Sequence, residues 1–350
     1  KIEDSEMDNR DIPLSNLDAG VVVEHLPAGE IFLADWSDYW YDRLASMAFV
    51  SDEGEVLAEA LCCTCSIDIA NADRDAVTLS IRKNAIESQI IYRIHPTVQF
   101  DYTDNTPTKL HLSIGRNRGG PETILTSLGH NPIQLHYEDL SMLDGKVFLS
   151  SRTDVITIAS NRLIPHAWPE DVSVRSEIDA LPPLRSIHDY IIDSARAEFD
   201  VVYYDHACLE MADIIAFRQG CVRFFHCKGQ DGEAPRCQIT DVYEINGQAA
   251  KSVHWANRKR ILKQLIERAD RNQTAVKLRK GTIPEIENIL NGFESPIIPV
   301  EIYVVHPGLK LTNHAGPQIE AFERVRRLLS STDTYFQQLS QCKLFVLGSA

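Results

Sequence analysis

The sequence lacks a long hydrophobic run, since no stretch approaches about 18 uninterrupted apolar residues, the length that a membrane-spanning helix needs. Its first residues, KIEDSEMDNRD, are charged and contain no apolar segment of the kind found in signal peptides. We therefore expect a cytoplasmic protein that has no membrane partner.

Cysteine is also scarce, and the common nucleotide motifs are missing. Eight cysteines among 350 residues are too few for a disulfide-rich scaffold. Three of them lie within residues 62–65, but no second pair of ligands follows at the spacing of a zinc finger. The glycine-rich residues 115–120 lack the pattern of a phosphate-binding loop. These absences argue against a structural zinc site and against a nucleoside triphosphatase motor in this chain.

Basic residues are outnumbered, with 35 Lys and Arg against 50 Asp and Glu, and the formal net charge is −15. The imbalance is local: residues 1–60 carry 15 acidic and 3 basic side chains, whereas residues 251–280 carry 10 basic and 2 acidic ones. A basic stretch in an acidic protein can hold a polyanion, although a solvated basic helix has the same composition. The acidic segment suggests a protein partner or a cover over the basic surface, because it repels nucleic acid.

The pattern of apolar residues changes along the chain. Up to about residue 164 it consists of short β-branched runs separated by Gly, Pro, Asn and Asp, which is typical of a β-rich domain. Two consecutive prolines at residues 182–183 break regular structure, and we place a boundary beside them. We expect a flexible acidic N-terminus over residues 1–13, a β-rich domain for interaction or nucleic-acid positioning over residues 14–180, and an α/β domain over residues 181–350.

The C-terminal half alternates between helical and strand-like periodicity. Residues 186–199 predict a helix, and the next apolar segments, residues 200–204, 209–217 and 221–227, predict strands. A long helix is predicted over residues 241–269. It is followed by a strand at 297–305, a helix at 318–330 and a last strand at 344–347. This order predicts an α+β or α/β fold.

Polar side chains interrupt the predicted strands of this domain. Asp213 lies within an apolar run, where a carboxylate needs a cation or hydrogen-bond donors. Side chains alternate between the two faces of the strand at residues 221–227, so His226 and Lys228 point the same way. Gln248 belongs to a polar stripe of the following helix. We expect these four side chains to converge on one site.

The predicted elements follow one another in a fixed order: a helix, a strand hairpin that bears Asp213, a strand that ends in H-x-K, and a helix that bears Gln248. This order resembles the PD-(D/E)XK nuclease superfamily. More narrowly, residues 209–213, 225–228 and 241–252 resemble a nuclease module at the C-terminal end of bacterial helicase-like proteins in antiphage defence loci. The resemblance implies a restriction-endonuclease-like α/β domain with a central mixed sheet.

The resemblance also implies an activity, namely hydrolysis of phosphodiester bonds in DNA, with RNA as the alternative, by water that Mg²⁺ or Mn²⁺ activates. It assigns the metal to Asp213, the carbonyl of Cys227, and Glu210 or Asp205. It assigns catalysis to Asp213, His226, Lys228, Gln248 and Glu210, with Lys228 orienting the water and stabilising charge on the phosphate. The residues expected to bind nucleic acid are Lys251, Trp255, Arg258, Lys259, Arg260 and Lys263.

Two features depart from the family's pattern. Position 226 is His where the commonest motif has a carboxylate, and imidazole suits Mn²⁺ better than Mg²⁺. Glu210 lies three residues before Asp213, a spacing that puts the two on opposite faces unless the strand bulges.

Three interpretations therefore stay open. The first is a nuclease that works with a helicase, an ATPase, another defence subunit or a second copy of itself. The second is a catalytically inactive nucleic-acid-binding or assembly subunit on the same fold. The third is an unrelated α/β enzyme in which Asp213 and Lys228 form only an ion pair.

Overall fold

The computed structural model of the chain describes most of its second half and parts of its first half. The described residues are 21–22, 31–35, 47–51, 55–59, 64–68, 76–83, 86–94, 100–104, 111–114, 122–145, 147–151, 154–206, 211–230, 232, 234–268, 277–339 and 341–350. The expected N-terminal segment 1–13 and the candidate residue Glu210 lie outside them. The chain divides into two compact units, of which one contains Ser15–Asp154 and the other Val155–Ala350.

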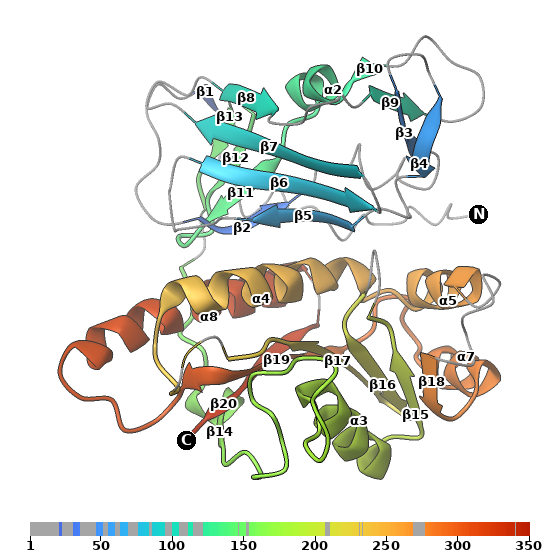
Figure 1. The fold of residues 1–350 in the computed structure, drawn as a ribbon, viewed down its shortest axis with the longest axis vertical. Coiled ribbons are helices and arrows are strands. Elements are labelled where there is room, and N and C mark those ends of the chain that lie inside the picture. Colours follow the sequence, from blue (N-terminus) through green and yellow to red (C-terminus); the bar gives the residue numbers. More distant parts are fainter. Residues whose placement is uncertain are drawn as a thin grey trace. The chain divides into compact units, whose positions relative to one another are not determined.

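The N-terminal unit consists of antiparallel strands and one described helix (Figure 1). Its five-stranded sheet has the order β1 (Val21–Val22), β13 (Val147–Leu149), β12 (Met142–Asp144), β11 (Gln134–Tyr137) and β2 (Ile31–Asp35). One four-stranded sheet has the order β10 (Glu122–Thr123), β9 (His111–Ile114), β3 (Met47–Val50) and β4 (Val56–Glu59). A second has the order β5 (Thr64–Asp68), β6 (Ala76–Lys83), β7 (Ile86–Ile94) and β8 (Phe100–Asp104). Helix α2 spans Ile124–His130. Alternate residues of β6, namely Val77, Leu79 and Ile81, are buried, as the period of two in a strand requires.

The C-terminal unit contains one seven-stranded mixed sheet. The strand order is β14 (Leu163–His166), β20 (Lys343–Ser349), β19 (Val300–Lys310), β17 (Cys221–Cys227), β16 (Ile214–Arg218), β15 (Val201–Tyr204) and β18 (Leu278–Lys280). Neighbours from β14 to β17 run parallel, and neighbours from β17 to β18 run antiparallel. The described part of the chain is therefore a mixed α/β structure, as the alternation of helical and strand-like segments predicted.

Helices pack on both faces of this sheet (Figure 1). Helix α3 (Ile187–Glu198) buries Ile187, Ile191 and Ala195 against the strands on one face. Helices α4 (Ile239–Lys251) and α8 (Pro317–Leu339) cover the other face, and the Asn246 side-chain amide of α4 donates a buried hydrogen bond to Thr332 of α8. Helix α7 (Ile283–Asn291) packs beside α5 (Arg258–Arg268) and β16. None of the helices in the described ranges is long and apolar enough to cross a membrane.

The boundary between the units lies before residue 155, earlier than the boundary that we expected at residues 180–181. Residues 155–180 belong to the C-terminal unit because they bond to its far end. The Ile156 amide donates to Thr334, Arg162 of the short helix η5 (Ser160–Arg162) pairs with Asp333, and β14 adds to the sheet beside β20. Two prolines mark a loop inside this unit, since they come just before α3.

The long helix predicted over residues 241–269 is divided into three pieces. Helix α4 ends at Lys251, a 3₁₀ turn η6 spans Ser252–Trp255, and α5 begins at Arg258. The break falls where Ser252 is buried and its hydroxyl is bonded to groups outside the helix. The helical structure is therefore interrupted at the start of the basic stretch of residues 251–280.

Candidate metal centre

The ends of three neighbouring strands meet at one edge of the central sheet. Because β15 and β16 are antiparallel and β16 and β17 are antiparallel, Tyr204 and Phe225 both lie opposite Ile214 at the start of β16. The residues that follow β15, precede β16 and follow β17 must then gather at the same edge. These residues include His206, Asp213 and Lys228.

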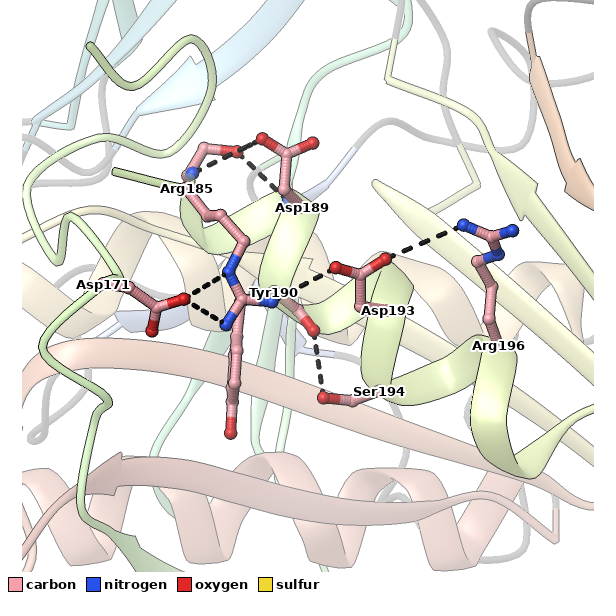
Figure 2. Close-up of polar contacts among 8 residues, drawn as sticks. Asp171, Arg185, Asp189, Tyr190, Asp193, Ser194 and Arg196 are labelled. Carbon is pink, nitrogen blue, oxygen red and sulfur yellow. Dashed lines mark hydrogen bonds and ion pairs between the residues drawn. The ribbon is translucent and has the colours of Figure 1, made fainter. Parts of the chain in front are cut away.

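A loop in front of α3 brings further side chains to this edge. Residues 171–186 are fixed at both ends, because the Arg185 amide donates to the Asp171 carbonyl and the Gln230 amide, just after β17, donates to the Val174 carbonyl. Figure 2 shows the Arg185 guanidinium between the carboxylates of Asp171 and Asp193, which lies on α3. These contacts hold the loop against the helix and hold Glu177 near the sheet edge.

The start of α3 positions His188. Ser186 caps the helix by accepting a hydrogen bond from the Asp189 amide, and the Asp189 carboxylate in turn accepts one from the Ser186 amide, as in a capping box. His188 is the second residue of the helix and is 2% exposed. Its amide donates to the Glu177 carbonyl, so the loop and the helix present Glu177 and His188 together.

Four side chains form a compact group around Asp213. Asp213 is 3% exposed; its Oδ1 lies 2.9 Å from His206 Nδ1 and 3.9 Å from His188 Nε2. Its Oδ2 accepts a hydrogen bond of 2.8 Å from the Cys227 amide. One ligand atom from each of Glu177, His188, His206 and Asp213 lies within 4.8 Å of every other, so the group could hold a metal ion.

Burial and charge act on the ionisation of this group. Burial favours the neutral form of Asp213, but hydrogen bonds from His206 and from the Cys227 amide, with the nearby histidines, keep its pKa below the usual value. Burial raises the pKa of Glu177, and the Asp213 charge raises it further against the opposing effect of Lys228. Burial lowers the pKa of His188. Two carboxylates and a neutral imidazole at one point are suited to a cation, which relieves the repulsion between the carboxylates.

The strands carry Asp213, His226 and Lys228 at the positions that the sequence predicted, but the three side chains do not all lie on the same side of the sheet. Lys228 Nζ pairs with Glu244 of α4 at 2.8 Å and is close enough to Glu177 to lower its pKa. His226 Nε2 lies 2.6 Å from the Ser252 hydroxyl. His226 and Lys228 thus share the α4 face of the sheet, as their spacing indicated. The metal-binding group does not include His226.

The other candidates for the metal lie elsewhere or have other partners. Asp205 is fully buried; its Oδ2 accepts from the Met211 amide and its Oδ1 lies 3.7 Å from Lys277 Nζ. Asp205 is not part of the four-residue group. The Cys227 thiol packs in the hydrophobic cluster beneath α3 and the Cys227 amide donates to Asp213, while the role of the Cys227 carbonyl as a metal ligand stays a prediction. Glu210 lies outside the described residues.

Gln248 and the six candidate nucleic-acid contacts lie on α4, η6 and α5. Gln248 is partly buried on α4, and its carbonyl accepts from Ser252. Arg258 donates to the Phe293 carbonyl and Arg260 to the His254 carbonyl, so both guanidinium groups hold backbone. Lys259 and Lys263 are exposed on α5. Lys251 and Trp255 are partly buried.

Sequence reasoning did not find Glu177, His188 or His206. For His206 the sequence offered one signal: it follows the candidate Asp205, just after the strand predicted over residues 200–204. Glu177 and His188 gave no such signal because they meet the group only through the loop before α3. Comparison with known proteins finds no match: no family model, no curated protein and no solved structure corresponds to this chain.

Proposed function

We propose that this protein is a metal-dependent nuclease of the PD-(D/E)XK type, which hydrolyses phosphodiester bonds in DNA, with RNA as the alternative substrate. The observation that carries the proposal is that Asp213, one of the four residues that could hold a metal ion, and Lys228 extend from neighbouring strand ends. Metal-dependent phosphodiester hydrolysis uses both features, a metal-activated water and a positive charge for the phosphate.

The order of elements around the group supports the same family. Helix α3 is followed by the antiparallel strands β15, β16 and β17 and then by α4, which lies on the other face of the sheet (Figure 1). The carboxylate precedes the second strand and the lysine follows the third. This is the order on which the resemblance to the superfamily rests.

Each side chain has a task in this proposal. Glu177, His188, His206 and Asp213 would hold the ion. A divalent ion bound there lowers the pKa of a coordinated water and offsets charge on the phosphate. The Cys227 amide fixes the Asp213 carboxylate in its orientation. Lys228 supplies a positive charge to a phosphate oxygen, and Gln248, on the same side as Lys228, positions the strand or the attacking water.

The substrate would extend from the metal centre toward α5. Lys259 and Lys263 are the exposed cations there, because Arg258 and Arg260 are engaged with backbone carbonyls. The N-terminal sixty residues are acidic, opposite in charge to the basic stretch, and suit a protein partner that itself binds DNA. Such a partner would be a helicase, an ATPase, another subunit of an antiphage defence system or a second copy of the chain.

One observation favours the second candidate, a catalytically inactive binding or assembly subunit. The Lys228 ammonium is paired with Glu244, whose side chain is 53% exposed. A lysine held by a carboxylate carries less charge to a phosphate. An ion pair that is this exposed is worth little, however, so a phosphate can compete for the lysine. This is why we place the nuclease first.

The deciding experiment is an assay of cleavage of single- and double-stranded DNA and RNA with Mn²⁺, Mg²⁺ or EDTA. We expect cleavage that needs metal and falls by about 100-fold or more in Lys228→Ala, the usual loss when one charge-stabilising group is removed. Lys343→Ala, which changes an exposed lysine at the start of β20, is the matched control and should leave the rate unchanged. Metal-dependent cleavage that Lys228→Ala retains in full would contradict the assignment of Lys228.

Absence of cleavage by the folded wild type would favour the binding subunit. In that case the Lys228→Ala variant should bind DNA as the wild type does. A third outcome supports the unrelated enzyme: neither cleavage nor DNA binding, with Asp213→Ala lowering thermal stability and no rise in stability on adding Mn²⁺ to the wild type.

A further inference from the structure

The group at the sheet edge contains one buried polar atom whose position needs a cause. His188 Nε2 has no hydrogen-bond partner among the described residues, although the side chain is 2% exposed. The atom is 3.9 Å from Asp213 Oδ1, too far for a hydrogen bond, and belongs to the set of four ligand atoms that converge within 4.8 Å. Leaving a buried polar atom unpaired costs about 1–3 kcal/mol, so such an atom calls for an explanation, and a bound ion among the converging ligand atoms is one.

The other ring nitrogen of His188 has a partner that can fix the tautomer of the ring. Nδ1 lies 3.1 Å from the Tyr204 hydroxyl, and Tyr204 ends β15 directly before the loop that carries His206. The side chain is 2% exposed and burial disfavours a charged ring, so one nitrogen carries a proton and the other a lone pair. If Nδ1 donates to the tyrosine oxygen, the lone pair is on Nε2 and points into the group. A histidine ligand ordinarily donates its second nitrogen in this way, which fixes the ring and its tautomer.

His206 can supply the second nitrogen. Its Nδ1 donates to Asp213 Oδ1 at 2.9 Å, and its side chain is 33% exposed. A ring at the surface can move its proton to the nitrogen that faces water when an ion replaces the bond to Asp213. The set of donors is then two imidazole nitrogens and two carboxylates.

This set of donors separates two classes of divalent ion. Mg²⁺ takes oxygen ligands in an octahedron and keeps several waters, and it is held by one or two carboxylates together with phosphate oxygens. Imidazole nitrogen is a ligand of first-row transition metals, and mixed nitrogen and carboxylate sites hold Mn²⁺, Fe²⁺ and Zn²⁺. A buried imidazole with a free lone pair is of little use to Mg²⁺.

We infer that Glu177, His188, His206 and Asp213 form a site for a divalent first-row transition metal, not for Mg²⁺, and that Tyr204 is the positioning residue that orients His188 Nε2 toward the ion. The inference names the ion of the site in the proposed function and rests on that function only for the ion's role in hydrolysis. Binding itself requires no substrate.

Titration with Mn²⁺ tests the inference. The chain of residues 1–350 is first treated with a chelator and desalted, and free Mn²⁺ is then measured by electron paramagnetic resonance. Mn²⁺ is the probe because thiols, including the buried Cys237 and Cys342, bind it weakly. We expect one Mn²⁺ per chain, displaced by Zn²⁺ and retained in about 100-fold excess of Mg²⁺. Displacement by that excess of Mg²⁺, or no stoichiometric binding, would overturn the inference.

Tyr204→Phe measures the positioning role, and the chain offers a matched control. His166 Nε2 and the Tyr190 hydroxyl form a second histidine–tyrosine pair at 2.8 Å, with Tyr190 also on α3 (Figure 2). We expect Tyr204→Phe to weaken Mn²⁺ binding by about 10–100-fold, and Tyr190→Phe to leave it unchanged. Equal effects of the two variants would show that Tyr204 acts only through stability.

His188→Gln should abolish binding, and His206→Gln, at a more exposed position, remains informative if the first variant does not fold. Mn²⁺ binding by a chain that cleaves no nucleic acid supports the metal site and removes the proposed function. Mn²⁺-dependent cleavage that His188→Gln and His206→Gln both retain overturns the metal site and leaves the nuclease, with another set of ligands.

Discussion

His226 lies beneath the end of α4, where its ring has one hydrogen bond. The Ser252 hydroxyl accepts from Nε2 at 2.6 Å and can itself donate to the Met211 carbonyl at 3.1 Å. Nδ1 has no partner among the described residues. Burial lowers the pKa of His226 to about 4, against the weaker opposing effect of Asp213. The ring is therefore neutral in the folded protein at pH 7.

This ionisation makes the stability of the protein depend on pH. Between about pH 6.5 and pH 4 the unfolded chain takes up a proton at His226 that the folded protein does not. The unfolded state then binds more protons, so stability falls with falling pH, by about 3 kcal/mol over this window. The His226→Gln variant has no titrating ring at this position. Urea denaturation of the wild type and of this variant from about pH 8 to pH 4 measures the difference between their free energies of unfolding. A difference in stability that stays constant with pH would show that the buried ring titrates with the same pKa as in the unfolded chain.

The residues of the site differ in how far the sequence could predict them. Asp213 lies directly before β16 and Lys228 directly after β17, and a polar residue beside an apolar run with clear periodicity stands out. Glu177 and His188 depend on a loop whose path is set by Arg185 and by bonds to the residues after β17. Contacts between distant segments leave no periodic pattern, and so the sequence did not predict that Glu177 and His188 lie beside Asp213.

At the scale of elements, the break between α4 and α5 is the main departure from the predicted order. Residues 241–269 have continuous helical composition, but Ser252 lies at the point where β17 and the segment before β16 need a hydrogen-bonding partner. The Ile298 amide, before β19, donates to the Ala256 carbonyl and so uses a group that a continuous helix would have bonded internally. Tertiary contacts thus outweigh helix propensity here, which composition alone does not show.

Ser252→Ala tests what this break contributes. The change leaves the buried Nε2 of His226 and the Met211 carbonyl without their shared partner, and we expect the free energy of unfolding to fall by about 1–3 kcal/mol. Ser194→Ala is the control, because its hydroxyl bonds the Tyr190 carbonyl on the exposed side of α3 (Figure 2) and should matter by about 0.5 kcal/mol or less. Urea denaturation at pH 7 measures both. Equal losses would mean that the Ser252 hydroxyl bonds contribute no more than an exposed one.

At the scale of the whole molecule, the position of the boundary decides which fragment is a folding unit. The helix predicted at residues 186–199 and the strand at residues 221–227 agree with α3 and β17 to within a residue. The edge strand β14, in contrast, was assigned to the wrong side of the boundary. It pairs in parallel with β20, the last strand of the chain, and a pairing across that distance cannot be read from local composition.

A fragment of residues 155–350 should therefore unfold in one cooperative transition and bind Mn²⁺ as the full chain does. A fragment of residues 181–350 lacks Glu177 and the strand that covers the edge of β20, and an exposed edge promotes aggregation. It also lacks Arg162, whose loss leaves the buried Asp333 carboxylate without its cation at a cost of about 3 kcal/mol. Circular dichroism during urea denaturation, with gel filtration, compares the two. Equal stability and Mn²⁺ affinity of the shorter fragment would restore the boundary beside the two prolines and remove Glu177 from the metal site.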